Sequence, residues 1–151
     1  MVYDALYQGY QKKENEFLYQ LPQKPEQLAY VSPKVWGHEE WIVNNAQYCG
    51  KKLVFKAGYC CSLHYHKIKE ETFYILSGKV LIDIEENGIK SNRVMTAGDT
   101  QHIPQGMIHR INALTDAEVM EFSTFHMEED SYRIIPAGKI DLSEFGFYKN
   151  S

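Results

Sequence analysis

Four side chains in two short blocks of this chain have the types and the spacing of a metal site. His64 and His66 lie two residues apart, and Glu71 follows five residues later. Alternate side chains of a β-strand project from the same face, so the two imidazoles point in one direction if this segment is extended. The second block adds His109 after the turn-forming residues 104–106 (Pro-Gln-Gly). Three imidazoles and one carboxylate form a ligand set that one divalent transition metal favours, with zinc, manganese, nickel and iron as the candidates.

A framework of glycines and one proline surrounds both blocks. Gly58 precedes His64 by six residues, Gly78 follows Glu71 by seven, and Gly98 opens the second block. Glycine at a strand end supplies a positive φ or a close approach of two backbones, and a Pro-x-Gly sequence forces a tight corner. This framework favours four side chains that face one cavity over polar residues on a solvated sheet.

The two blocks together resemble the cupin superfamily, whose signature motifs are Gly-x5-His-x-His-x(3,4)-Glu-x6-Gly and Gly-x5-Pro-x-Gly-x2-His-x3-Asn. Residues 58–78 match the first motif in full. Residues 98–109 match the second, and Asn112 falls one residue earlier than the motif's asparagine. The resemblance implies a double-stranded β-helix whose interior is a funnel, with the metal partway down.

The composition is that of one ordinary globular domain. The 151 residues are 44% hydrophobic, which excludes disorder throughout the chain. The formal net charge is −4 and no Lys or Arg run exceeds two residues, so we expect no nucleic acid partner. With no long apolar run and no secretory signal pattern, we expect a cytoplasmic protein that does not bind a membrane. The three cysteines, Cys49, Cys60 and Cys61, cannot all pair, and reduced thiols fit that compartment.

Many short strands at spacings near ten residues predict an all-β barrel or sandwich. The barrel domain is expected over residues 35–126, with an N-terminal arm at 1–34 and a short C-terminal tail, 127–151, packed on the barrel. Asn87-Gly88 predicts a type I′ hairpin turn. The strands are expected at 40–44, 50–57, 59–66, 72–76, 79–85, 93–95, 100–103, 108–112 and 118–126.

Regular alternation along residues 59–66 would place Cys60 on the same face as Ser62, His64 and His66. The Cys60 thiol could then line the same cavity as the histidines. Buried cysteine is more often a small hydrophobe in a core, so the pattern leaves both interpretations open.

A narrower resemblance, over residues 33–135, is to the type II mannose-6-phosphate isomerase cupins. It rests on the run Val-Trp-Gly-His-Glu-Glu-Trp at 35–41, Lys52-Leu53 and Ser62-Leu63, Ile103-Pro104 and His109-Arg110, and the late Glu-Asp-x-x-Arg at 129–133. His66, Glu71 and His109 fall on positions that this family uses for metal, whereas His64 stands where it often has glutamine. The resemblance implies a small sugar or sugar phosphate as the substrate.

The ligand set suggests a mechanism for such a substrate. A divalent metal could chelate the carbonyl and the adjacent hydroxyl of an open-chain aldose and stabilise the enediolate of aldose–ketose interconversion. Glu121, on the last expected strand, is the candidate base that moves the proton between adjacent carbons.

Four cationic residues are candidates for binding a substrate phosphate. Lys67 and Lys69 are expected on the solvated rim of the barrel. Arg110 follows a ligand directly, so on strand alternation it faces away from the metal. Arg133 is expected to pair with Asp130 rather than with phosphate.

Two other functions fit the same residues. Nitrogen and oxygen ligands with open coordination positions also suit the Fe(II) of a non-haem oxygenase. A metal-holding cupin can also be a binding or accessory protein that recognises a sugar without converting it. Because a strand-rich chain has sheet edges to protect, and an N-terminal arm could cover them, we also expect a homodimer.

Overall fold

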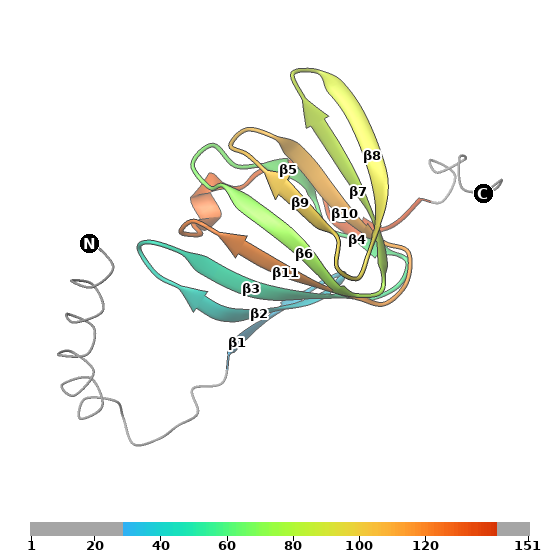
Figure 1. Ribbon diagram of the computed structural model, residues 1–151, viewed down its shortest axis with the longest axis horizontal. Helices are drawn as coiled ribbons and strands as arrows, with labels where there is room; N and C mark the ends of the chain where they lie inside the picture. The colour runs from blue at the N-terminus through green and yellow to red at the C-terminus, as the bar shows by residue number, and fades with distance from the viewer. Residues whose placement is uncertain (1–28, 142–151) are drawn as a thin grey trace, which may run out of the picture.

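Two antiparallel sheets face each other in the computed structural model, which describes residues 29–141 (Figure 1). Within that range the one helical segment is a short 3-10 turn, η1 (Glu128–Asp130). The first sheet has the strand order β1-β2-β3-β11-β6-β9. Its strands are β1 (Tyr30–Lys34), β2 (Gly37–Asn44), β3 (Cys49–Phe55), β6 (Glu71–Ser77), β9 (Thr100–Ile103) and β11 (Ala117–Ser123).

The second sheet is built around β10 (Ile108–Ala113), which pairs with β7 and with the two halves of an interrupted strand, β4 and β5. Outside those halves, β12 pairs with β5 and β13 pairs with β4. A hairpin of β7 and β8 stands out at the top of the view in Figure 1. These strands are β4 (Tyr59–Cys60), β5 (Leu63–Tyr65), β7 (Lys79–Glu86), β8 (Ile89–Thr96), β12 (Tyr132–Ile135) and β13 (Gly138–Lys139).

Burial with a period of two explains why these segments form strands. In β3 the side chains of Cys49, Lys51, Leu53 and Phe55 are buried, and those of the two residues between the last three are only half-buried. β11 shows the same alternation. The inward apolar residues of both sheets fill the space between them, and Trp36 stacks on Phe55 there with ring centroids 4.3 Å apart. The predicted all-β double-stranded β-helix is therefore confirmed.

Two turns depend on special backbone conformations. Asn87 and Gly88 have φ values of 52° and 77° between β7 and β8, which confirms the predicted type I′ turn. Gly78 joins β6 to β7 with φ of 82°, and a Cβ there would lie 2.1 Å from the Asp116 carbonyl oxygen. The glycine that closes the first motif therefore lets two backbones approach closely.

The ends of the chain lie largely outside the described residues. Of the arm expected over 1–34, the described part includes β1, which pairs with β2 at the edge of the first sheet. Of the tail expected over 127–151, residues to 141 are described, and they contribute η1, β12 and β13. No helix among residues 29–141 has the length and apolar character needed to cross a bilayer. The homodimer stays a prediction.

Candidate metal centre

The structure brings the four candidate ligands together between the sheets. His64 lies on β5, His66 follows that strand, Glu71 begins β6, and His109 lies on β10 directly opposite His64. One ligand atom from each residue lies within 4.8 Å of the others. His66, Glu71 and His109 are buried and His64 is half-buried. Three strands of two different sheets thus meet at one point, as a closed sandwich allows.

Backbone carbonyl groups orient all three imidazoles. A carbonyl oxygen only accepts hydrogen bonds, so the ring nitrogen beside it must carry the hydrogen. Each Nδ1 therefore donates, which leaves Nε2 as the ring atom that can bind a metal. The accepting carbonyls are those of Ser62 for His64 (2.8 Å), Asp130 for His66 (3.0 Å) and Met107 for His109 (2.9 Å).

Buried acceptor atoms face each other across the cluster. Nε2 of His109 lies 2.8 Å from Oε1 of Glu71, and Nε2 of His66 lies 3.8 Å from the same oxygen. Within residues 29–141, neither the Glu71 oxygens nor Nε2 of His109 make a hydrogen bond of normal geometry. Buried polar atoms are rarely left in this state, because desolvation without a partner is costly. A divalent cation among these atoms would satisfy them, so the residues present fit a metal ion.

Burial also sets the charges that a metal needs. Burial lowers the pKa of His64 to about 3, and the neighbouring His109 adds to this effect. Burial likewise lowers the pKa of His66. Burial would raise the pKa of Glu71, but His109 and Lys69 outweigh it and hold that pKa well below its ordinary range. At neutral pH His64 and His66 are therefore neutral and Glu71 is ionised, the forms that bind metal.

Comparison with known proteins places this site in a family. The family model described as "Cupin domain" matches residues 52–125, a range that contains all four candidate ligands. The chain belongs to the cupin superfamily. Over 63 residues this cupin is also 35% identical to the uncharacterized protein YdbB of Bacillus subtilis (strain 168), with 42% of the chain and 51% of YdbB covered. The chain thus spans about half the length of that relative.

Solved structures share the fold at lower identity. Against CapF of Staphylococcus aureus, a capsular polysaccharide assembling protein, the TM-score is 0.63 at 18% identity, covering 71% of this chain and 34% of CapF. Against oxalate decarboxylase of Bacillus subtilis, which has Mn(II) centres, it is 0.64 at 22% identity, covering 70% and 30%. The cupin spans about a third of each, and identities this low show the fold alone.

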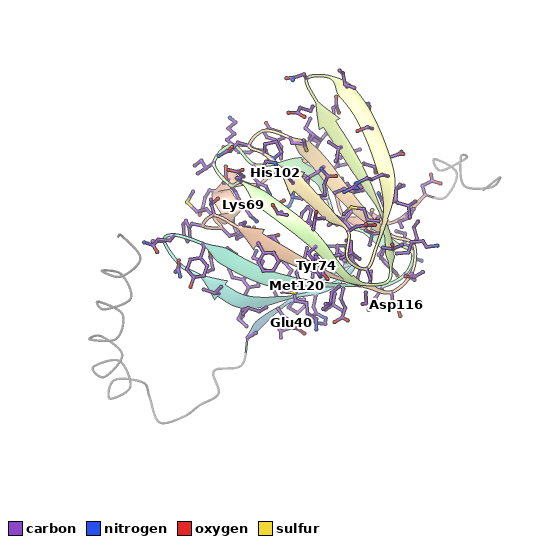
Figure 2. The ribbon with its side chains drawn as sticks, viewed as in Figure 1. Glu40, Lys69, Tyr74, His102, Asp116 and Met120 are labelled. Atoms are coloured by element: carbon purple, nitrogen blue, oxygen red, sulfur yellow. The ribbon has the colours of Figure 1, made fainter. Side chains whose placement is uncertain are left out.

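Lys69 was expected on the solvated rim, and the structure shows that this was wrong. Its side chain is 2% exposed, and its Nζ donates to Oε2 of Glu121 at 2.7 Å and to Nδ1 of His126 at 3.2 Å. It also lies 3.0 Å from Oε2 of the ligand Glu71. Burial alone would lower the pKa of Lys69, but Glu121 and Glu71 raise it above its ordinary value. Figure 2 shows Lys69 beside η1, at one end of the sandwich.

Asp130 explains why Lys69 turns inward. Its carboxylate accepts hydrogen bonds from the backbone N–H groups of Lys67, Ile68 and Lys69 at 2.9–3.2 Å. These bonds fix the loop between β5 and β6. The expected pairing of Asp130 with Arg133 is therefore wrong, and Arg133 instead lies 3.5 Å from Glu128.

Arg110 lies on the side of β10 away from the candidate ligands, as the alternation predicted. Its Nε donates to the Cys61 carbonyl at 3.0 Å, and its Nη2 donates to the Pro136 carbonyl at 3.1 Å. A substrate held at the cluster would not meet this guanidinium.

A cavity of about 200 Å³ contains the ligand cluster. Glu121, the candidate base, lines it and is buried, with 5% of its surface exposed. Three further charged residues of the first sheet, Lys34, Glu39 and Lys51, line the same cavity and were missed by sequence reasoning. The alternation of β3 carried the signal for Lys51, because Leu53 and Phe55 share its face. Apolar walls come from Trp36, Leu53, Phe73 and Ile111.

Cys61, rather than Cys60, lines this cavity. The register of β10 changes by one residue between the pairs Asn112–Cys60 and His109–His64. Such a bulge inserts one residue into the interrupted strand and reverses the face of everything before it. The alternation from His64 therefore assigned the wrong cysteine to the cavity. Burial raises the pKa of the Cys61 thiol to about 12, so it is not a ready thiolate.

Proposed function

We propose that this cupin is a metal-dependent enzyme acting on a small sugar or sugar phosphate, in an aldose–ketose isomerisation. The observation that carries the proposal is a buried carboxylate outside the ligand cluster, that of Glu121, in the same cavity as the four candidate ligands. Isomerisation needs a Lewis acid at the carbonyl and a base at the neighbouring carbon, and the cavity offers residues for both.

The chain's own residues would divide the work. The cluster would hold a divalent ion, which supplies Lewis acidity at the substrate carbonyl and offsets the negative charge that develops as the proton leaves. Glu121 would take the proton from one carbon and return it to the next. Within the described chain, both hydrogen bonds of this carboxylate, from Lys69 and from the Ser123 hydroxyl, go to Oε2. That arrangement supports Oε1 as the proton-accepting atom.

The apolar walls would exclude bulk water during the transfer. Phe73 and Ile111 lie beside the cluster, and Trp36 and Leu53 line the same cavity. A low-dielectric wall strengthens the attraction between the metal centre and the developing charge.

The test is transfer of solvent deuterium into a sugar. Protein loaded with Zn, Mn or Ni is incubated in D₂O with aldoses and aldose phosphates, and nuclear magnetic resonance follows deuterium at the carbon beside the carbonyl. We expect exchange with the wild type and loss of most of it in Glu121→Gln. Glu118→Gln is the matched control, since Glu118 lies on the same strand and pairs with Lys52 outside the cavity.

Other outcomes would favour the other two functions. Oxygen uptake by iron-loaded protein without deuterium transfer would indicate an oxygenase. Sugar binding with neither reaction would indicate a binding protein. The fold does not choose among them, because a capsular polysaccharide assembling protein and an oxalate decarboxylase both share it.

A further inference from the structure

Lys51 is a charged side chain buried inside the cavity. It lies on β3 and is 1% exposed. Its register partners are Trp41 on β2 and Glu121 on β11, so all three side chains share the inner face of the first sheet. Lysine is almost never fully buried without a partner of its own, because removing an ammonium group from water is costly. The ammonium group of Lys51 therefore needs negative charge close by.

The partners of Lys51 do not match its charge. Its Nζ lies 3.4 Å from Oε2 of Glu39 and 3.9 Å from the ring centroid of Trp41. Glu39 is shared, because Lys34 lies 3.3 Å from its other oxygen. In the part of the chain that the structure describes, Lys51 has no second carboxylate partner. Two ammonium groups thus have the same carboxylate as their nearest partner at this end of the cavity, and Glu128, whose charge interacts with that of Lys34, lies farther away.

The cavity as a whole would carry excess positive charge once a metal is bound. Its lining contains four lysine or arginine side chains and four glutamates, so the protein's own charges cancel. A divalent ion at the cluster adds two positive charges. An interior with excess charge is stabilised by a ligand of opposite charge. The cavity therefore favours an anion over a neutral molecule.

The position of Lys51 indicates how far from the metal-binding end of the ligand that negative charge would lie. β11 separates β3 from β6, which carries the ligand Glu71. Two strand spacings correspond to about 10 Å between backbones, and both side chains point into the space between the sheets. A group bound by Lys51 is therefore separated from the metal by a distance on the scale of a pentose or hexose chain. Lys34 has 27% of its side chain exposed, which places it toward solvent beside this end.

We infer that Lys51, together with Lys34, binds an anionic end group of the substrate, a carboxylate or a phosphate, while the metal cluster binds the carbonyl end. This inference rests on the proposed function, since it takes the ligand to be a sugar. It replaces the phosphate partners expected from the sequence with two lysines that share Glu39. It also makes a neutral sugar a poor ligand.

The test uses sugars that differ only at the terminal carbon. Mannose, mannose 6-phosphate and mannuronate, and the corresponding glucose and galactose series, are titrated into zinc-loaded protein in a calorimeter. We expect at least one anionic member of a series to bind about tenfold or more tightly than its neutral parent. The member that gains distinguishes a phosphate from a carboxylate. Equal affinities in every series, or no binding by any anionic member, would overturn the inference.

Two variants change the preference in opposite directions. Lys51→Met should remove most of the preference for the anion, and Glu39→Gln should strengthen it severalfold by freeing both lysines. Lys52→Met is the control, because this neighbour pairs with Glu118 on the outside of the sheet. Zinc content and melting temperature are measured for each variant to check that it is folded. If Lys51→Met does not fold, the anion preference of Glu39→Gln still tests the inference. Unchanged preferences in Glu39→Gln would count against the inference.

The experiment separates this inference from the proposed function. Binding is measured without turnover, so a protein that transfers no deuterium can still show the anion preference. Conversely, deuterium transfer with equal affinity for neutral and anionic sugars would keep the isomerase and reject the subsite.

Discussion

The two ends of the cavity are charged in opposite ways. At the cluster, Nε2 of His109 and Oε1 of Glu71 lie 2.8 Å apart, and among residues 29–141 neither atom makes a hydrogen bond of normal geometry. At the other end, Lys34 and Lys51 share the one carboxylate of Glu39. Glu71 at the first end keeps one cation, Lys69, on its other oxygen, whereas the two ammonium groups at the second end have the same carboxylate as their nearest partner. This difference is what the proposed binding of a metal at one end and of an anionic group at the other would explain.

Between the two ends, by contrast, Lys69 connects several of the buried polar groups. Lys69 donates to Glu121 and His126 and lies against Glu71. His126 in turn donates from Nε2 to Glu128 at 3.1 Å. This chain of contacts separates the two unfinished ends.

The largest effect is expected for a variant that removes one candidate metal ligand. His66→Ala removes one ligand, and we expect metal affinity to fall by more than about 100-fold while the β-sandwich stays folded. Elemental mass spectrometry of protein purified without chelator, together with circular dichroism, measures both. His102→Ala is the matched control, because His102 is exposed and pairs with Glu70. Metal content equal to wild type in His66→Ala would remove the basis for the site.

A second variant breaks the paired interior. Lys69→Met leaves the carboxylates of Glu71 and Glu121 buried without their cation, so we expect a loss of about 3–5 kcal/mol in the free energy of unfolding. Zinc should recover part of that loss, because it supplies positive charge at Glu71. Urea unfolding with and without zinc measures this, and Lys67→Met, an exposed neighbour, is the control. A loss under about 1 kcal/mol would mean that the contacts of Lys69 are weak.

Lowering the pH should reduce the free energy of unfolding of the metal-free protein, because of His64 in the ligand cluster. The pKa of His64 is about 3 in the folded protein, below its ordinary 6.5. Between these two pH values His64 is protonated in the unfolded chain but not in the folded protein. Stability therefore falls as the pH drops from 6.5 toward 3. One such group contributes a slope of up to about 1.4 kcal/mol per pH unit. Urea midpoints across this range should fall less steeply in His64→Gln, and an equal slope would contradict the assignment.

The smallest effect is expected for a variant of the aromatic residue that packs against Lys51. Trp41→Phe keeps an aromatic ring under Lys51 but weakens the cation–π contact, so we expect a loss of about 0.5–1 kcal/mol in the free energy of unfolding. Denaturant titration can resolve this. A loss of several kcal/mol would show that the indole, more than Glu39, holds the ammonium group in place.

The sequence predicted the parts of the molecule that follow a period. The strands follow the two-residue alternation, and the spacing of His64, His66, Glu71 and His109 is enough to group these four residues as one ligand set. The hairpin at Asn87-Gly88 follows from the φ values that these residues tolerate.

What the sequence could not predict depends on contacts between distant segments. Lys69 lies in a loop without periodicity, and its direction is set by a carboxylate sixty-one residues later in the chain. The exchange of Cys60 for Cys61 comes from a bulge that alternation cannot reveal. The burial of Lys51 could have been predicted from the alternation of β3. A lysine next to another lysine is, however, usually expected to be solvent-exposed unless the burial pattern of its strand is considered.

Asp130 has a consequence for how the protein is made. Its carboxylate fixes the loop at residues 67–69, and its carbonyl orients His66. The last candidate ligand, His109, leaves the ribosome twenty-one residues before Asp130 does. A nascent chain thus carries every ligand before it carries the residue that aims one of them. If the cluster binds a metal, we therefore expect full affinity only after η1 has been synthesised.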